Sequence, residues 1–103
     1  MDRIAKLQEM LAQSPGDSFL QHAIALEFIK RGNDPKARRY FEELLALDPS
    51  YVGSYYHLAK LLERNGDTSV AIATYEKGME QAKNVKDQHA YNELRVAWEE
   101  LTF

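Results

Sequence analysis

Apolar residues recur along this chain with the spacing of amphipathic helices. In residues 18–31, Leu20, Ile24 and Phe28 follow one another at intervals of four positions, which places them on one face of a helix. No segment is expected to form a strand. The pattern predicts six helices, at about residues 2–13, 18–31, 35–47, 51–64, 68–83 and 87–101.

Glycine and capping residues mark the expected ends of these helices. Gly32 and Gly66 stand where a helix needs a left-handed residue just past its end, a conformation that glycine adopts without steric cost. Asn84 is the corresponding residue before the last helix. The next helices are expected to begin at side-chain caps, Asp34 after the first glycine and Thr68 after the second. Each glycine therefore joins two helices into a hairpin.

The order of large and small residues repeats every 34 positions. A shift by 34 residues aligns, without a gap, the identical pairs Ala25 and Ala59, Gly32 and Gly66, Ala37 and Ala71, and Glu42 and Glu76. One hairpin cannot bury both of its apolar faces, so repeated hairpins stack and bury a continuous core between them. We therefore expect one domain over residues 1–103, divided into a half repeat 2–17, repeats 18–51 and 52–85, and a C-terminal capping helix 86–103.

These units resemble the tetratricopeptide repeat, a helix–turn–helix unit of 34 residues. The matching residues of the second repeat are Tyr55, Leu58, Ala59, Leu62, Gly66, Asp67, Ala71 and Tyr75. Those of the first repeat are Ile24, Ala25, Phe28, Gly32, Ala37, Phe41 and Pro49. The resemblance implies an all-α fold, a right-handed α-solenoid of about six helices, in a small stand-alone protein or in part of a longer array. It also implies the family's usual function, protein–protein interaction.

In this family the first helix of each repeat lines a concave groove, and side chains not needed for internal packing point into it. On this sequence the resemblance implies a partner-binding groove formed by Phe19, His22, Leu26, Ile29, Lys30, Tyr56, His57, Lys60 and Arg64. The apolar and aromatic members of this set are expected to anchor a protein or peptide partner. The lysines and the arginine are expected to orient it.

The helix expected at 18–31 is apolar on almost every side, and such a helix is normally buried. Phe19, Leu26 and Ile29 therefore need a cover. A partner protein, a second copy of the chain in a homodimer, or the folded-back C-terminal helix would each provide one. The same residues are also compatible with a plain extension of the core, and these alternatives stay open at this stage.

Some family members bind the C-terminal carboxylate of a peptide with lysine and asparagine residues on the concave helices. In this chain the corresponding positions hold His22, Leu26, His57, Ala90 and Leu94. The carboxylate clamp is therefore absent. The basic residues of the groove remain suited to an acidic partner through charge complementarity.

Charge argues against nucleic acid and membrane partners. Lys and Arg number 13 and Asp and Glu 16, which gives a net charge of −3. The basic residues between Lys30 and Arg39 are balanced by acids within the same repeat, as on a solvated helix face. The longest apolar stretches, such as Ala23–Leu26, are far short of the ~20 residues that a membrane span needs. Because Met1–Leu11 contains no continuous apolar core of a signal peptide, we expect a cytoplasmic protein.

The chain offers little for catalysis. It has no cysteine, no glycine-rich phosphate loop and no nucleophile elbow. His22 and His57 lie on neighbouring concave helices in the expected fold, but two ligands are too few for a metal site. We therefore expect no enzyme activity, no cofactor and no metal.

Overall fold

The computed structural model describes residues 2–103 and is built from helices. The helices are α1 (Arg3–Gln13), α2 (Ser18–Lys30), α3 (Asp34–Leu47), α4 (Gly53–Arg64), α5 (Thr68–Asn84) and α6 (Gln88–Thr102). No strand occurs within the described residues. The all-α prediction with six helices is confirmed, and the expected bounds differ from the observed ones by at most two residues.

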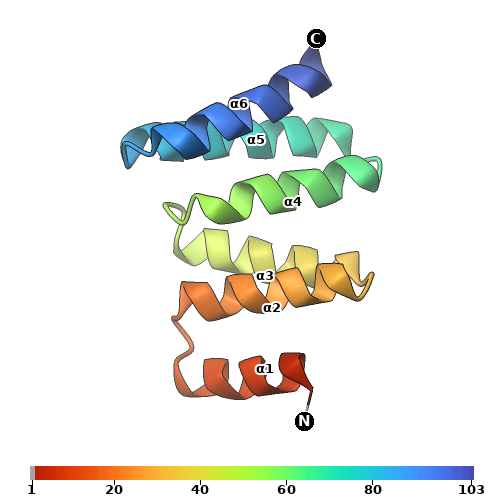
Figure 1. The fold of residues 1–103 in the computed structure, drawn as a ribbon, viewed down its shortest axis with the longest axis vertical. Coiled ribbons are helices and arrows are strands. Elements are labelled where there is room, and N and C mark those ends of the chain that lie inside the picture. Colours follow the sequence, from red (N-terminus) through yellow and green to blue (C-terminus); the bar gives the residue numbers. More distant parts are fainter. Residues whose placement is uncertain (1) are drawn as a thin grey trace. The chain divides into compact units, whose positions relative to one another are not determined.

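Two compact units divide the chain, one ending at Asp48 and the other beginning at Pro49. In the first unit, α2 and α3 form an antiparallel hairpin and α1 packs on α2 (Figure 1). The core of this unit consists of Ile4, Leu7, Leu20, Ile24, Ala25, Phe28, Ala37, Phe41, Leu44 and Leu45. The large residues that recur at helical spacing in the sequence are therefore the ones that this unit buries.

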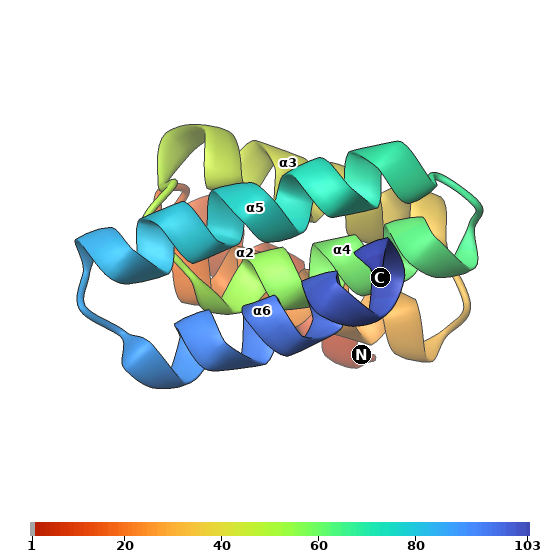
Figure 2. The ribbon, with the colours of Figure 1, turned by 90° about the horizontal axis from the view of Figure 1, so that it is seen from above.

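In the second unit, α4 and α5 form the hairpin and α6 packs on α5. Figure 2 shows α6 running beside α5, and α6 also contacts α4. The core of this unit consists of Tyr55, Leu58, Ala59, Leu61, Leu62, Ala71, Tyr75, Ala82, Leu94 and Ala97. The C-terminal helix is thus an integral part of the packing of this unit.

A glycine allows the three helices of the second unit to approach closely. Gly78 lies on α5 with its Cα facing Tyr55 of α4 and Leu94 of α6. A Cβ atom at this position would lie 2.7 Å from the Tyr55 Cβ and 3.0 Å from the Leu94 Cδ1. Carbon atoms pack at about 3.5–4.0 Å, so no side chain fits here without movement of its neighbours.

The helix ends follow the predicted turns but use other capping residues. Gly32 and Gly66 have φ values of 73° and 85°, as a left-handed stop requires. The caps predicted at Asp34 and Thr68 are wrong by one residue, because Asn33 and Asp67 occupy the N-cap positions. The Asn33 side chain accepts a hydrogen bond from the Lys36 backbone N–H.

The turn before α6 also differs from the prediction. Asn84 is the last residue of α5, and the left-handed residue is Lys86, with a φ of 61°. Asp87 then caps α6 by accepting a hydrogen bond from the Ala90 backbone N–H at 3.0 Å. The left-handed residue is two positions later than expected. The reason is that α5 extends past the position that corresponds, in the 34-residue repeat, to the end of α3.

Candidate functional site

The residues predicted for the groove on α2 form one stripe of the first unit. Phe19 is exposed to 65%, whereas Leu26 and Ile29 are half-buried. The His22 ring meets the buried Phe41 ring edge-on, with 5.7 Å between the ring centroids. The apolar anchors on α2 are therefore partly covered by their own unit, and Phe19 is the one that remains largely in solvent.

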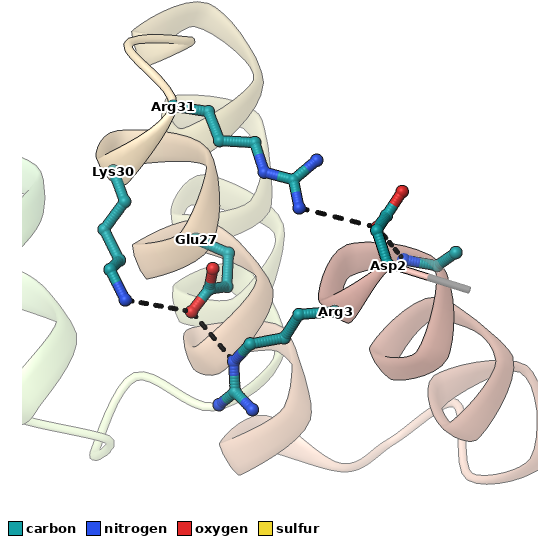
Figure 3. A network of polar contacts seen from close by, with 6 residues as sticks. Asp2, Arg3, Glu27, Lys30 and Arg31 are labelled. Atoms are coloured by element: carbon teal, nitrogen blue, oxygen red, sulfur yellow. Dashed lines mark hydrogen bonds and ion pairs between the residues drawn. The ribbon is translucent and has the colours of Figure 1, made fainter.

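Ion pairs surround the C-terminal part of α2 and connect it to α1 (Figure 3). The Glu27 Oε1 atom lies 2.8 Å from the Arg3 Nε atom and 3.6 Å from the Lys30 Nζ atom. Arg31 and Asp2 form a second pair at 3.5 Å. A hydrogen bond from the Ala5 backbone N–H, with the Arg31 charge nearby, lowers the pKa of the Asp2 carboxyl group. The Lys30 charge, predicted to orient a partner, is thus partly neutralised within the unit.

The residues predicted on α4 form a second stripe, in the second unit. Tyr56 and His57 are half-buried, with their ring centroids 5.8 Å apart. The Lys60 ammonium group lies 5.7 Å from the centre of the Tyr56 ring and 3.5 Å from the Glu63 Oε2 atom. Arg64 is exposed at the end of the helix. Burial lowers the pKa of His57, and the nearby Glu93 charge opposes this effect.

The nine predicted residues are thus divided between two units, with Phe19 to Lys30 on α2 and Tyr56 to Arg64 on α4. Within each unit the spacing places them on a single helix face. One continuous groove across both faces stays a prediction.

A groove of 390 Å³ lies between α4 and α6 within the second unit. Two of the predicted residues, Tyr56 and Lys60, line its α4 side. Its α6 side is lined by His89, Asn92, Glu93, Val96, Ala97 and Glu100. Sequence reasoning missed this second wall, because it treated the last helix only as a C-terminal cap of the repeats. The intervals of four, three and four residues between His89, Glu93, Val96 and Glu100 would have identified it as a helix stripe.

The groove combines an apolar floor with acidic groups on one side. Tyr56, Val96 and the buried Ala97 form the apolar part, and Val96 is exposed to 51%. The Glu93 Oε2 atom lies 3.5 Å from the exposed His89 Nε2 atom. Glu100 is exposed and has no ion pair or hydrogen bond within residues 2–103. Such a surface can hold an apolar side chain and attract positive charge.

No group of three His, Asp or Glu side chains within residues 2–103 is arranged to hold a metal ion. The described helices are also too short or too polar to cross a bilayer.

Helical hairpins that recur along the chain at a fixed period define a class of helical repeat protein. The family model of the tetratricopeptide repeat matches residues 28–95, about two thirds of the chain. The chain therefore belongs to the tetratricopeptide repeat family, whose members generally mediate protein–protein interaction. The resemblance inferred from the 34-residue period is confirmed.

Solved structures agree with this assignment. The chain is similar to a tetratricopeptide repeat domain protein from Salinibacter ruber, known from a solution NMR structure, with 44% identity, 84% of this chain and 88% of that chain covered, and a TM-score of 0.81. For a crystal structure of such a domain protein from the same organism, the identity is 43%, the coverage 84% and 97%, and the TM-score 0.80. A Bordetella parapertussis protein is 25% identical, with 99% and 89% covered and a TM-score of 0.83. No curated protein matches the chain.

Proposed function

We propose that this chain is a non-catalytic interaction module that binds a segment of a partner protein on the faces of α2 and α4. The observation that carries the proposal is the exposure of Phe19, a large aromatic side chain, on the same helix face as Leu26 and Ile29. Tyr56 gives the α4 face a second aromatic anchor. Aromatic side chains of this kind dominate the energetics of many protein interfaces.

Contacts within each unit limit the part that the basic residues play. Lys30 and Lys60 already pair with glutamates of their own helices, Glu27 and Glu63. Ion pairs three residues apart on one helix contribute about 0.2–0.5 kcal/mol, so a partner can exchange them without a large penalty. In the proposed complex the apolar anchors therefore supply most of the affinity, and the charges adjust the orientation.

A second candidate function, homodimerisation through the same faces, is favoured by the same exposed side chain. A twofold interface pairs a surface patch with its own copy, and an exposed aromatic ring beside half-buried aliphatic groups is suited to such pairing. Light scattering at micromolar concentration distinguishes the two functions. A monomer contradicts homodimerisation, whereas a stable dimer that Phe19→Asp dissociates favours it.

The test of partner binding uses affinity capture with the purified chain and three variants, two on the proposed faces and one control. Phe19→Asp places a charge on the proposed face, and Leu47→Asp places the same charge at a site on α3 that is exposed to 78%. A protein retained by wild type and by Leu47→Asp, but lost with Phe19→Asp or Tyr56→Ala, is the expected result. Equal retention by all four proteins would contradict the proposal for these faces.

A further inference from the structure

The groove between α4 and α6 differs in charge from the basic partner-binding groove that the family resemblance predicts. On its α4 side, the only cation, Lys60, is held by Glu63 and lies over the Tyr56 ring. Glu63 also accepts a hydrogen bond from the Tyr75 hydroxyl group of α5, so this carboxylate is fixed from two sides. On the α4 wall, the charges of Lys60 and Glu63 are therefore already paired with each other when a ligand arrives.

The α6 wall has unpaired negative charge. The carboxylate of Glu100 has no ion-pair or hydrogen-bond partner within residues 2–103. Glu93 pairs with His89 and also lies near His57, and both imidazoles are neutral unless protonated. The next acid along the helix is different, because the Glu99 Oε1 atom lies 3.6 Å from the Arg95 Nε atom. Two carboxylates of the groove thus remain available to a positively charged group.

The two carboxylates flank the apolar part of the groove. Glu93 and Glu100 are seven residues apart on α6, which corresponds to about 10 Å along the helix axis. Val96 lies between them, and Tyr56 faces it from α4. An extended segment rises about 3.3 Å per residue, so basic side chains two positions before and after an apolar residue reach both carboxylates. Residues at these alternate positions point to the same side of an extended chain.

We infer that this groove binds an extended segment of a partner protein in which lysine or arginine residues flank an apolar residue. The apolar side chain lies on Tyr56, Val96 and Ala97, and the flanking cations pair with Glu93 and Glu100. This inference rests on the proposed function and specifies the chemistry of the partner. It departs from the acidic partner that the basic residues of the sequence favour, because those lysines are paired in the structure.

The experiment measures binding of labelled peptides to the full chain by fluorescence anisotropy. The basic peptide has a leucine with an arginine two positions away on each side, and serine and glycine elsewhere. One control peptide has glutamate in place of arginine, and another has serine in place of leucine. We expect the basic peptide to bind more tightly than both controls and to weaken as salt rises, because exposed charges are screened.

Two neighbouring glutamates of α6 provide a matched pair of variants. Glu100→Gln removes an unpaired carboxylate of the groove, and Glu99→Gln removes a carboxylate that Arg95 already holds. Glu100→Gln is expected to weaken binding of the basic peptide by up to about fivefold, as for the loss of one exposed ion pair. Glu99→Gln is expected to leave the affinity unchanged. Glu100→Lys is expected to shift the preference toward the glutamate peptide. Because both positions are on the surface, thermal unfolding checks that the variants remain folded.

Location is tested by the backbone amide shifts of the labelled chain on peptide addition. Shifts concentrated at Lys60, Val96 and Ala97 support the inference. Three results would each overturn it. The glutamate peptide could bind more tightly than the basic peptide, Glu99→Gln and Glu100→Gln could weaken binding equally, or the chain could form a dimer that the peptide dissociates. The first two results would leave the proposed function intact if Phe19→Asp still abolished partner capture. Loss of peptide binding together with equal capture by all variants would overturn both.

Discussion

The replacement of Gly78 by alanine tests the packing of the second unit directly. The added Cβ would lie 2.7 Å from the Tyr55 Cβ and 3.0 Å from both the Tyr55 Cγ and the Leu94 Cδ1. The Tyr55 atoms are close to the backbone of α4 and cannot move without the helix. Overpacking of a core costs about 1–3 kcal/mol, whereas alanine gains about 1 kcal/mol over glycine within a helix. With three contacts too short, we expect a net loss of about 1–2 kcal/mol.

The assay is urea unfolding followed by the fluorescence of Trp98, the one tryptophan of the chain. Its Nε1 atom donates a hydrogen bond to the Glu76 Oε2 atom of α5 at 3.1 Å, so its emission reports on the contact between α5 and α6. For a domain of this size, each kcal/mol of lost stability lowers the melting temperature by about 4–8 °C. Gly53→Ala is the control, because a Cβ at Gly53 meets no atom within 4 Å.

Opposite signs are expected for the two substitutions. Gly53→Ala reduces the freedom of the unfolded chain without a clash and is expected to leave stability unchanged or raise it by up to about 1 kcal/mol. If Gly78→Ala were as stable as Gly53→Ala, the close approach of the three helices at position 78 would be refuted.

Three further predictions concern helix ends, protonation and local opening. Asp87→Ala removes the hydrogen bond to the Ala90 backbone N–H and is expected to cost about 1 kcal/mol in urea unfolding, whereas Asp87→Asn should retain nearly full stability. The pKa of His57 is below its ordinary value of 6.5 in the folded state, so the unfolded state takes up the proton first, and the free energy of unfolding should fall as pH drops below about 6.5; His57→Gln should reduce this slope, and an unchanged slope would contradict the stated cause. Because α1 buries only Ile4 and Leu7 as core residues, its amides are expected to exchange with deuterium before those of α2, and Leu7→Ala should accelerate α1 alone.

Most of the fold could be predicted because its determinants are local or periodic. The repeated positions Ala25 and Ala59, and Phe41 and Tyr75, are all buried as the 34-residue shift implies. Glycine at a helix end has a specific conformational reason, and Gly32 has the φ value expected for it. Periodicity and turn chemistry therefore suffice to place helices of this length to within about two residues.

The details that failed depend on choices between chemically similar neighbours. Asn33 and Asp34 both have side chains that can cap a helix, and the sequence alone does not decide between them. The left-handed Lys86 gives no compositional sign, because lysine has no preference for that conformation.

One wall of the groove between α4 and α6 could be predicted from the sequence, and the other could not. The stripe on α4 could be found from the family's geometry, and Tyr56 and Lys60 do line a groove. The α6 wall could not be found in this way, because a stripe with Glu93, Val96 and Glu100 has the composition of an ordinary solvated helix face. Only the packing of α6 against the α4–α5 hairpin turns that face toward Tyr56.

The width of that groove depends on a residue that does not line it. Tyr55 and Tyr56 are neighbours on α4, so the first turns into the contact with Gly78 while the second faces the groove. On α6, Leu94 meets the same glycine, and Ala97 lies one turn further along in the groove. A side chain at position 78 would push both helices away from α5 and so alter the distance between the Tyr56 and Val96 walls. The absence of a side chain at Gly78 therefore affects the spacing of the groove walls as well as the packing of the core.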